Sequence, residues 1–293
     1  MTPEGLSRLR NAGRRMSLGG RFMLPLRILR RTFYGAPGEV TIDDFDGALS
    51  VDLRLSEHMQ SRIFWMGYYS REVVAALDIL LRPGMAFLDI GANIGEISMV
   101  AARRVGRDGT VVAFEPVTSH AARLEGHLHR NGLDWVRVER LALSDHDADK
   151  AIFDSCGQGS SQDEHSGLNS LYGGNDDSQP TETVHVTTLD GYLDTHPLAR
   201  VDVIKIDVEG AELPCLVGAR RTVARHLPYL IIEVQATSAR IAGYEQAAIL
   251  KELERYGYQF RRLTAKGPGV TLEAGNLHEY QNVLCVPPTR PAP

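Results

Sequence analysis

Acidic residues stand at the ends of three apolar runs, and their types suggest binding and proton transfer. Asp89 closes one run, Glu115 follows the next, and Asp207 follows a third. Because the carboxyl ends of parallel strands meet at one crevice, we expect these side chains to lie near one another. A carboxylate at Glu115 can accept both hydrogen bonds of a ribose diol. A carboxylate at Asp207 can hold a hydroxyl acceptor or take its proton.

A glycine turn separates the first run from a helical pattern and indicates the kind of cofactor. The turn reads Gly91-Ala92-Asn93-Ile94-Gly95, so it carries Asn93 where a dinucleotide fingerprint has its middle glycine. Asp89, just before the turn, would repel a pyrophosphate but suits a cationic amino-acid group. The glycines let backbone N–H groups approach a ligand closely. These features favour S-adenosylmethionine over NAD, and a turn without any ligand is the plain alternative.

Two acids at the end of the third run are the candidate catalytic residues. We predict that Asp207 is the general base or holds the acceptor, with Glu209 second. The alternative is that both residues cap the following helix. Together with Glu233 they offer hard oxygen ligands for a divalent cation, but no spacing compels one, and we predict no metal.

Runs with strand character alternate with helical periodicity along the chain. The expected strands are 86–90, 110–115, 136–143, 184–189, 201–206, 228–234, 258–263 and 282–286. The expected helices are 61–81, 96–105, 119–131, 189–193, 210–224 and 244–256, and a hairpin over 39–53 precedes them. This alternation predicts an α/β protein built on a parallel sheet.

Composition limits the partners and the compartment. The 293 residues carry a net charge of -5, which argues against nucleic acid as a partner. Residues 1–31 nevertheless hold eight arginines and one acid, Glu4. This segment is either a helix packed on the domain, which we favour, or a peripheral contact with an anionic membrane; a transit peptide also fits its composition. Three cysteines without metal spacing are typical of a reducing, cytoplasmic location.

A polar insertion and a cluster of aromatic residues are the candidate acceptor contacts. Gly, Ser, Asp, Asn and Gln dominate residues 154–181, and so long a polar stretch inside a domain is usually functional or disordered. We place it at the mouth of the site. The predicted substrate-binding residues are Tyr68, Tyr69, Asn169, Ser170 and Glu233.

We divide the chain into four parts. These are a basic segment (1–36), an extension with a hairpin and a helix packed on the core (37–82), a cofactor-binding domain with the polar insertion (83–286), and a disordered tail (287–293).

Five ordered motifs resemble the FkbM family of S-adenosylmethionine-dependent methyltransferases over about residues 50–260. They are Asp89–Gly95, Phe114–Pro116, Ala142–Asp145, Thr188–Asp190 and Ile204–Glu212. The resemblance implies a class I methyltransferase (Rossmann-like) fold: a seven-stranded, mostly parallel sheet with helices on both faces and an antiparallel last strand. It also implies methyl transfer, usually to an oxygen of a sugar, glycan or polyketide.

The predicted cofactor contacts combine the turn with the ends of the following strands. They are Asp89, Gly91, Ala92, Asn93, Gly95, Glu115, Pro116, Leu143, Ser144 and Asp207. Two alternatives remain open: an NAD-dependent oxidoreductase, and a catalytically silent nucleotide-binding protein. The sequence identifies neither the acceptor atom nor the oligomeric state.

Overall fold

A computed structural model describes residues 3–16, 28–29, 31–33, 38–154, 169–172 and 182–291 of the chain. These residues fall into two compact units that meet in sequence between Ser70 and Arg71. Most of the polar insertion lies outside the described residues. No helix in the described ranges has both the length and the apolar composition needed to cross a bilayer.

The N-terminal unit is built on the predicted hairpin. Strand β1 (Glu39–Phe45) pairs antiparallel with β2 (Leu49–Arg54), and alternate side chains of both strands are buried. Helices α1 (Pro3–Met16) and α3 (His58–Met66) pack on the hairpin. The buried face of α1 presents Leu6 and Arg10, and the Arg10 guanidinium is paired with Asp44.

The helix expected over 61–81 is two helices, α3 and α4 (Arg71–Leu80). Gly67 ends α3 because its backbone adopts φ +92°, a left-handed conformation that favours glycine. Helix α4 packs against α5 (Glu96–Val105) and therefore belongs to the second unit, so the structural division comes earlier than residue 82.

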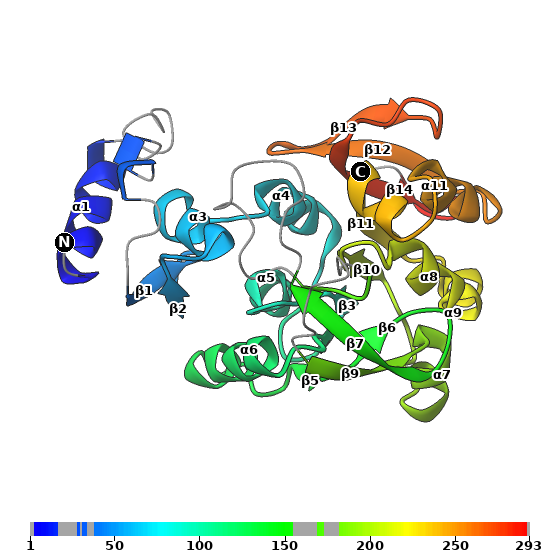
Figure 1. Ribbon diagram of the computed structural model, residues 1–293, viewed down its shortest axis with the longest axis horizontal. Coiled ribbons are helices and arrows are strands. Elements are labelled where there is room, and N and C mark those ends of the chain that lie inside the picture. The colour runs from blue at the N-terminus through cyan, green and yellow to red at the C-terminus, as the bar shows by residue number, and fades with distance from the viewer. Residues whose placement is uncertain are drawn as a thin grey trace. The chain divides into compact units, whose positions relative to one another are not determined.

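The second unit contains the mostly parallel sheet (Figure 1), eight-stranded where we expected seven strands. Its strands, in spatial order, are β13 (Gly267–Leu272), β12 (Gln259–Thr264), β14 (Tyr280–Val286), β11 (Tyr229–Gln235), β10 (Val203–Ile206), β3 (Ala86–Ile90), β4 (Thr110–Phe114) and β5 (Arg137–Glu139). The five strands from β11 to β5 are parallel, and β14 is antiparallel to both of its neighbours. The additional strand, β13, forms a hairpin with β12 through the turn at Gly267.

A second, four-stranded sheet comes from the middle of the chain. It consists of β6 (Ala142–Leu143), β9 (Glu182–Thr187), β7 (Ala148–Asp154) and β8 (Asn169–Ser170). The run expected as one strand over 136–143 is therefore divided between the two sheets.

Helices fill the connections between the strands of the second unit (Figure 1). They are α5, α6 (Thr118–Arg130), α7 (Leu189–Thr195), α8 (Glu212–Val217), α9 (Arg220–His226), α10 (Ala236–Ile241) and α11 (Ala247–Glu254). The core joins strand residues such as Ile204 and Leu230 to Leu216 and Val223 of α8 and α9. The helix expected to run from 210 to 224 breaks at Gly218, where a Cβ would lie 1.9 Å from the Ser144 carbonyl oxygen.

The end of the chain is held in place where we expected a disordered tail. Tyr229 donates a 2.7 Å hydrogen bond to the Pro291 carbonyl. The Arg290 guanidinium lies 3.3 Å from the Asp202 carboxylate. Arg200 also pairs with Asp202, at 2.6 Å, so Arg290 is the second cation on a buried carboxylate. This pairing explains why residues 287–291 stay on the domain.

Candidate active site

The turn after β3 has a backbone that only small residues allow. Gly91 has φ +81°, and a Cβ there would lie 1.9 Å from the Asp207 carbonyl oxygen. At Gly95, with φ +94°, a Cβ would lie 2.2 Å from a Leu124 methyl carbon. Asn93 is also left-handed (φ +49°), and its side chain accepts a 2.8 Å hydrogen bond from the Ile94 N–H. The turn therefore lies directly against Asp207, which follows β10, and against the side of α6.

All five N–H groups of the turn donate within the chain. Those of Gly91 and Ala92 donate to Phe114, and that of Gly95 donates back to Ala92. The N–H of Asn93 donates to Glu115 at 2.7 Å, and that of Ile94 to the Asn93 side chain. We expected these groups to approach a ligand, but the structure uses them to shape the turn. A pyrophosphate cradle needs such donors free.

Glu115 is buried at the end of β4 and holds both sides of the turn. One carboxylate oxygen accepts from the Asn93 N–H, and the other accepts from the Val117 N–H at 3.0 Å. His120 lies 3.7 Å from the second oxygen. Each carboxylate oxygen has two acceptor sites, so each retains one for a further donor such as a ribose hydroxyl.

Asp89 lies beneath the turn rather than in the crevice. Its side chain has no exposed surface, accepts a 2.6 Å hydrogen bond from Ser98, and lies 3.4 Å from the Lys205 ammonium. Burial raises the pKa of Asp89, and the charge of Lys205 opposes this shift. The expected direct contact with a cationic ligand group is therefore not available in this arrangement, and Asp89 acts on the turn through Lys205.

Lys205 is the residue of this site that the sequence analysis missed. It lies in β10 directly across from Asp89 of β3, and its ammonium donates a 2.7 Å hydrogen bond to the Gly91 carbonyl. The same ammonium is 3.4 Å from Asp207. The signal for it was a lone charge inside the apolar run Val203–Ile206, because a charge buried in a sheet requires partners.

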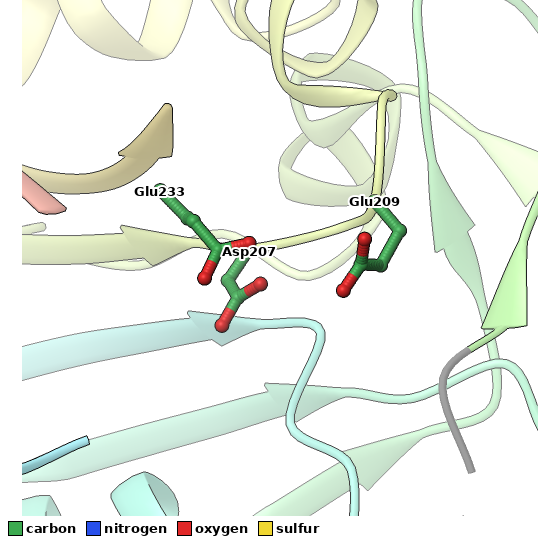
Figure 2. Close-up of side chains that lie close together, drawn as sticks. All are labelled: Asp207, Glu209 and Glu233. Atoms are coloured by element: carbon green, nitrogen blue, oxygen red, sulfur yellow. The ribbon is translucent and has the colours of Figure 1, made fainter. Parts of the chain in front are cut away.

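Asp207, Glu209 and Glu233 form an acidic cluster at the carboxyl end of the sheet, and Figure 2 shows their carboxyl groups close together. One oxygen from each residue lies within 4.8 Å of the others. Asp207 has 28% of its side chain exposed, whereas Glu233 is buried and accepts a 2.7 Å hydrogen bond from Tyr280. The structure thus brings together both predicted catalytic residues and one predicted substrate contact.

Burial and mutual repulsion determine the charge of this cluster. Burial, together with the charges of Asp207 and Glu212, raises the pKa of Glu209 to about 8. Burial and the charges of Asp207 and Glu209 raise the pKa of Glu233 well above its ordinary value. Near neutral pH the cluster therefore retains protons, and Glu209 can accept one slightly above neutrality.

The alternative that Asp207 and Glu209 cap the following helix does not match the hydrogen bonds. The N–H groups of Val208 and Gly210 both donate to Glu212, at 3.1 Å from its nearest oxygen in each case. Tyr244 donates to the same carboxylate. Among the described residues, no side chain caps α8 at Ala211, and Glu212 instead holds the loop before the helix, so the carboxylates of Asp207 and Glu209 belong to the cluster and not to a helix cap.

A family model for the methyltransferase FkbM domain matches residues 89–260, more than half of the chain. The chain belongs to this family. The chain therefore carries a methyltransferase domain over these residues, and S-adenosylmethionine is the cofactor of this class of domain.

Individual relatives are more distant. The AMB antimetabolite synthetase AmbE of Pseudomonas aeruginosa is 28% identical in an alignment of 249 residues that covers 75% of this chain and 11% of that protein. The chain thus spans about a tenth of this curated relative. A methyltransferase FkbM from Methylobacillus flagellatus has 17% identity and a TM-score of 0.43, with 78% of this chain and 54% of that one covered. Aeropyrum pernix fibrillarin, with natively bound S-adenosyl-L-methionine, has 12% identity and a TM-score of 0.44, with 73% and 74% covered.

Two of the predicted cofactor contacts of this FkbM-family chain, Leu143 and Ser144, lie on the second sheet. Leu143 and Ser144 are buried at the end of β6, and the Ser144 N–H donates to Thr187. Pro116, directly after Glu115, is partly exposed. The donor set suits S-adenosylmethionine, because Glu115 retains acceptors for a ribose while the turn offers no free N–H to a phosphate.

The predicted acceptor contacts separate into two groups. Ser170 donates a 2.6 Å hydrogen bond to the Glu209 carbonyl, so it borders the acidic cluster. The backbone of Asn169 pairs with β7, but its side chain lies outside the described part of the chain. Tyr68 and Tyr69 belong to the N-terminal unit, where the Tyr68 hydroxyl donates to Asp46.

Proposed function

We propose that this protein transfers a methyl group from S-adenosylmethionine to a hydroxyl oxygen of a sugar, glycan or polyketide-type small molecule. The observation that carries the proposal is the acidic cluster next to the glycine turn, in which Glu209 has a pKa of about 8. A base of this strength suits an alcohol, because general bases work best when their pKa lies near the working pH. Acid–base catalysis of this kind contributes roughly 10²–10⁴-fold.

When bound, S-adenosylmethionine supplies an electrophilic methyl group. Glu115 binds the ribose hydroxyls with the acceptor sites that its two N–H contacts leave free. Asp207, partly exposed at the sheet edge, holds the acceptor hydroxyl, and Glu209 receives its proton. Alignment of the two substrates provides most of the rate, since correct orientation alone can replace several kcal/mol of barrier.

Two alternatives have weaker support. NAD would bring a pyrophosphate to a turn whose N–H groups are already bonded within the chain. A catalytically silent protein would have no use for a carboxyl group with a pKa of about 8 in a cluster of three acids.

We assign no metal to the site. The oxygens of Asp207, Glu209 and Glu233 are hard ligands of the kind that Mg²⁺ takes. Lys205 and the retained protons already offset their charge, however. Methyl transfer that survives thorough chelation would agree with this assignment, and restoration by added Mg²⁺ alone would overturn it.

The test of the proposed function is a screen of hydroxyl acceptors with radiolabelled S-adenosylmethionine. We expect transfer to a polyhydroxylated acceptor, and we expect Asp207→Ala to lower kcat about 100-fold or more while cofactor affinity falls less than about tenfold. Glu245→Ala, an exposed carboxylate on the surface, is the matched control. Unchanged turnover in Asp207→Ala would remove Asp207 from the reaction.

A further inference from the structure

The ammonium of Lys205 lies at the centre of the site, yet methyl transfer as described above does not use it. The residue occupies the middle of the sheet, where β10 is paired with β3 on one side and β11 on the other. Only 6% of its side chain is exposed. A buried ammonium is destabilising unless its partners are well placed, so the identity of those partners indicates what the residue does.

Lys205 contacts two parts of the site that are far apart in sequence. Its Nζ donates to the Gly91 carbonyl at 2.7 Å, which holds the cofactor turn. The same Nζ lies 3.4 Å from the Asp89 carboxylate below the turn and 3.4 Å from the Asp207 carboxylate in the acidic cluster. One cation is therefore shared by the turn and the cluster.

Backbone contacts make the same connection more rigid. The Asp207 N–H donates to the Ile90 carbonyl at 3.1 Å. The Asp207 carbonyl fills the space where a Cβ of Gly91 would lie. A displacement of the turn must therefore move Asp207. Lys205 adds a side-chain link between the same two parts, because its ammonium contacts both the Gly91 carbonyl and the Asp207 carboxylate.

We propose that Lys205 is a positioning residue that couples the cofactor turn to Asp207, so that the bound cofactor and the acceptor-holding carboxylate keep one fixed arrangement. The inference rests on the proposed function and adds a residue to it. An ion pair with Asp89 alone would be a structural contact, because Asp89 is wholly buried. The second carboxylate, Asp207, is partly exposed at the edge of the sheet and gives Lys205 a functional partner.

A double-mutant cycle on binding tests the coupling without an acceptor. Dissociation constants of S-adenosylhomocysteine and S-adenosylmethionine are measured by calorimetry for the full chain and for Lys205→Met, Asp207→Asn and the double variant. We expect each single substitution to weaken binding severalfold and the double variant to be no weaker than Lys205→Met. This corresponds to a coupling of at least about threefold. Lys251→Met, an exposed lysine on α11, should bind as the wild type does.

The outcomes separate the two claims. Multiplicative effects in the cycle would overturn the role of Lys205 and leave the methyltransferase assignment intact. Wild-type protein that binds neither ligand would remove the proposed function, and the inference with it. If Lys205→Met does not fold, Lys205→Arg replaces it: the guanidinium retains the charge, so binding must still respond to Asp207→Asn severalfold, and loss of that response contradicts the proposal.

Discussion

Glu209 illustrates how the environment of one residue determines its chemistry. Its backbone is left-handed (φ +49°), and its half-buried carboxyl group lies beside two other acids. Because its pKa is raised to about 8, the deprotonated form that can accept a proton becomes dominant only above that pH.

The pH dependence of turnover tests this role of Glu209. We expect kcat to rise between about pH 7 and 9 and the rise to disappear in Glu209→Gln, whose amide does not titrate. Glu245→Gln, at the surface, should keep the wild-type profile. A rise of kcat near pH 8 that persists in Glu209→Gln would show that another group titrates there.

At the residue scale, the pattern of acids at the ends of apolar runs predicts which strand ends come together but not which partners hold each side chain. The run 201–206 predicted that Asp207 would lie near the turn after Asp89, and the pairing of β10 with β3 puts it beside that turn. Asp89 shares that pattern, yet Ser98 and Lys205 hold it under the turn. Such contacts join residues from separate strands, and no local pattern indicates them.

The glycine turn is the element on which the site depends most. Gly91 and Gly84 have the same backbone angle, φ +81°, but a Cβ at Gly84 meets no atom within 4 Å. We expect Gly91→Ala to lower the free energy of unfolding about 1–3 kcal/mol more than Gly84→Ala does, because only the former forces the turn away from Asp207. Denaturant titration of both variants measures the difference. Equal destabilisation by the two substitutions would show that the close approach of Gly91 to the Asp207 carbonyl does not contribute to stability.

Helix α1 bears on the two interpretations of residues 1–31, which are a packed helix and a peripheral contact with an anionic membrane. Leu6 and Arg10 are buried in the N-terminal unit. A basic surface that could meet a membrane must therefore come from exposed residues such as Arg8. Because packing is the interpretation that we favour, we expect the full chain not to float with anionic vesicles, and a variant with Arg8, Arg14 and Arg15 changed to Glu to behave in the same way with Leu6 and Arg10 intact. Flotation of the full chain that is lost in the variant would instead establish the membrane contact.

The sequence predicted the fold class of the whole molecule better than it predicted the boundaries of its units and strands. The alternation of runs predicted the parallel sheet, and the parallel strands from β11 to β5 confirm it. Strand β13 and the division at Ser70 depend on tertiary pairing, through the turn at Gly267 and the packing of α4. Residues 287–291 also depend on tertiary contacts, because Arg290 lies beside Asp202 only in the folded domain.

The central claim is that this fold presents an S-adenosylmethionine site whose ribose contact is Glu115. Calorimetric titration with S-adenosylmethionine, S-adenosylhomocysteine and NAD tests it on the wild type, on Glu115→Ala and on the exposed control Glu125→Ala. We predict that the wild type and the control bind the first two ligands and not NAD, and that Glu115→Ala loses at least about tenfold in affinity for both. Binding of NAD, or undiminished binding by Glu115→Ala, would contradict the account.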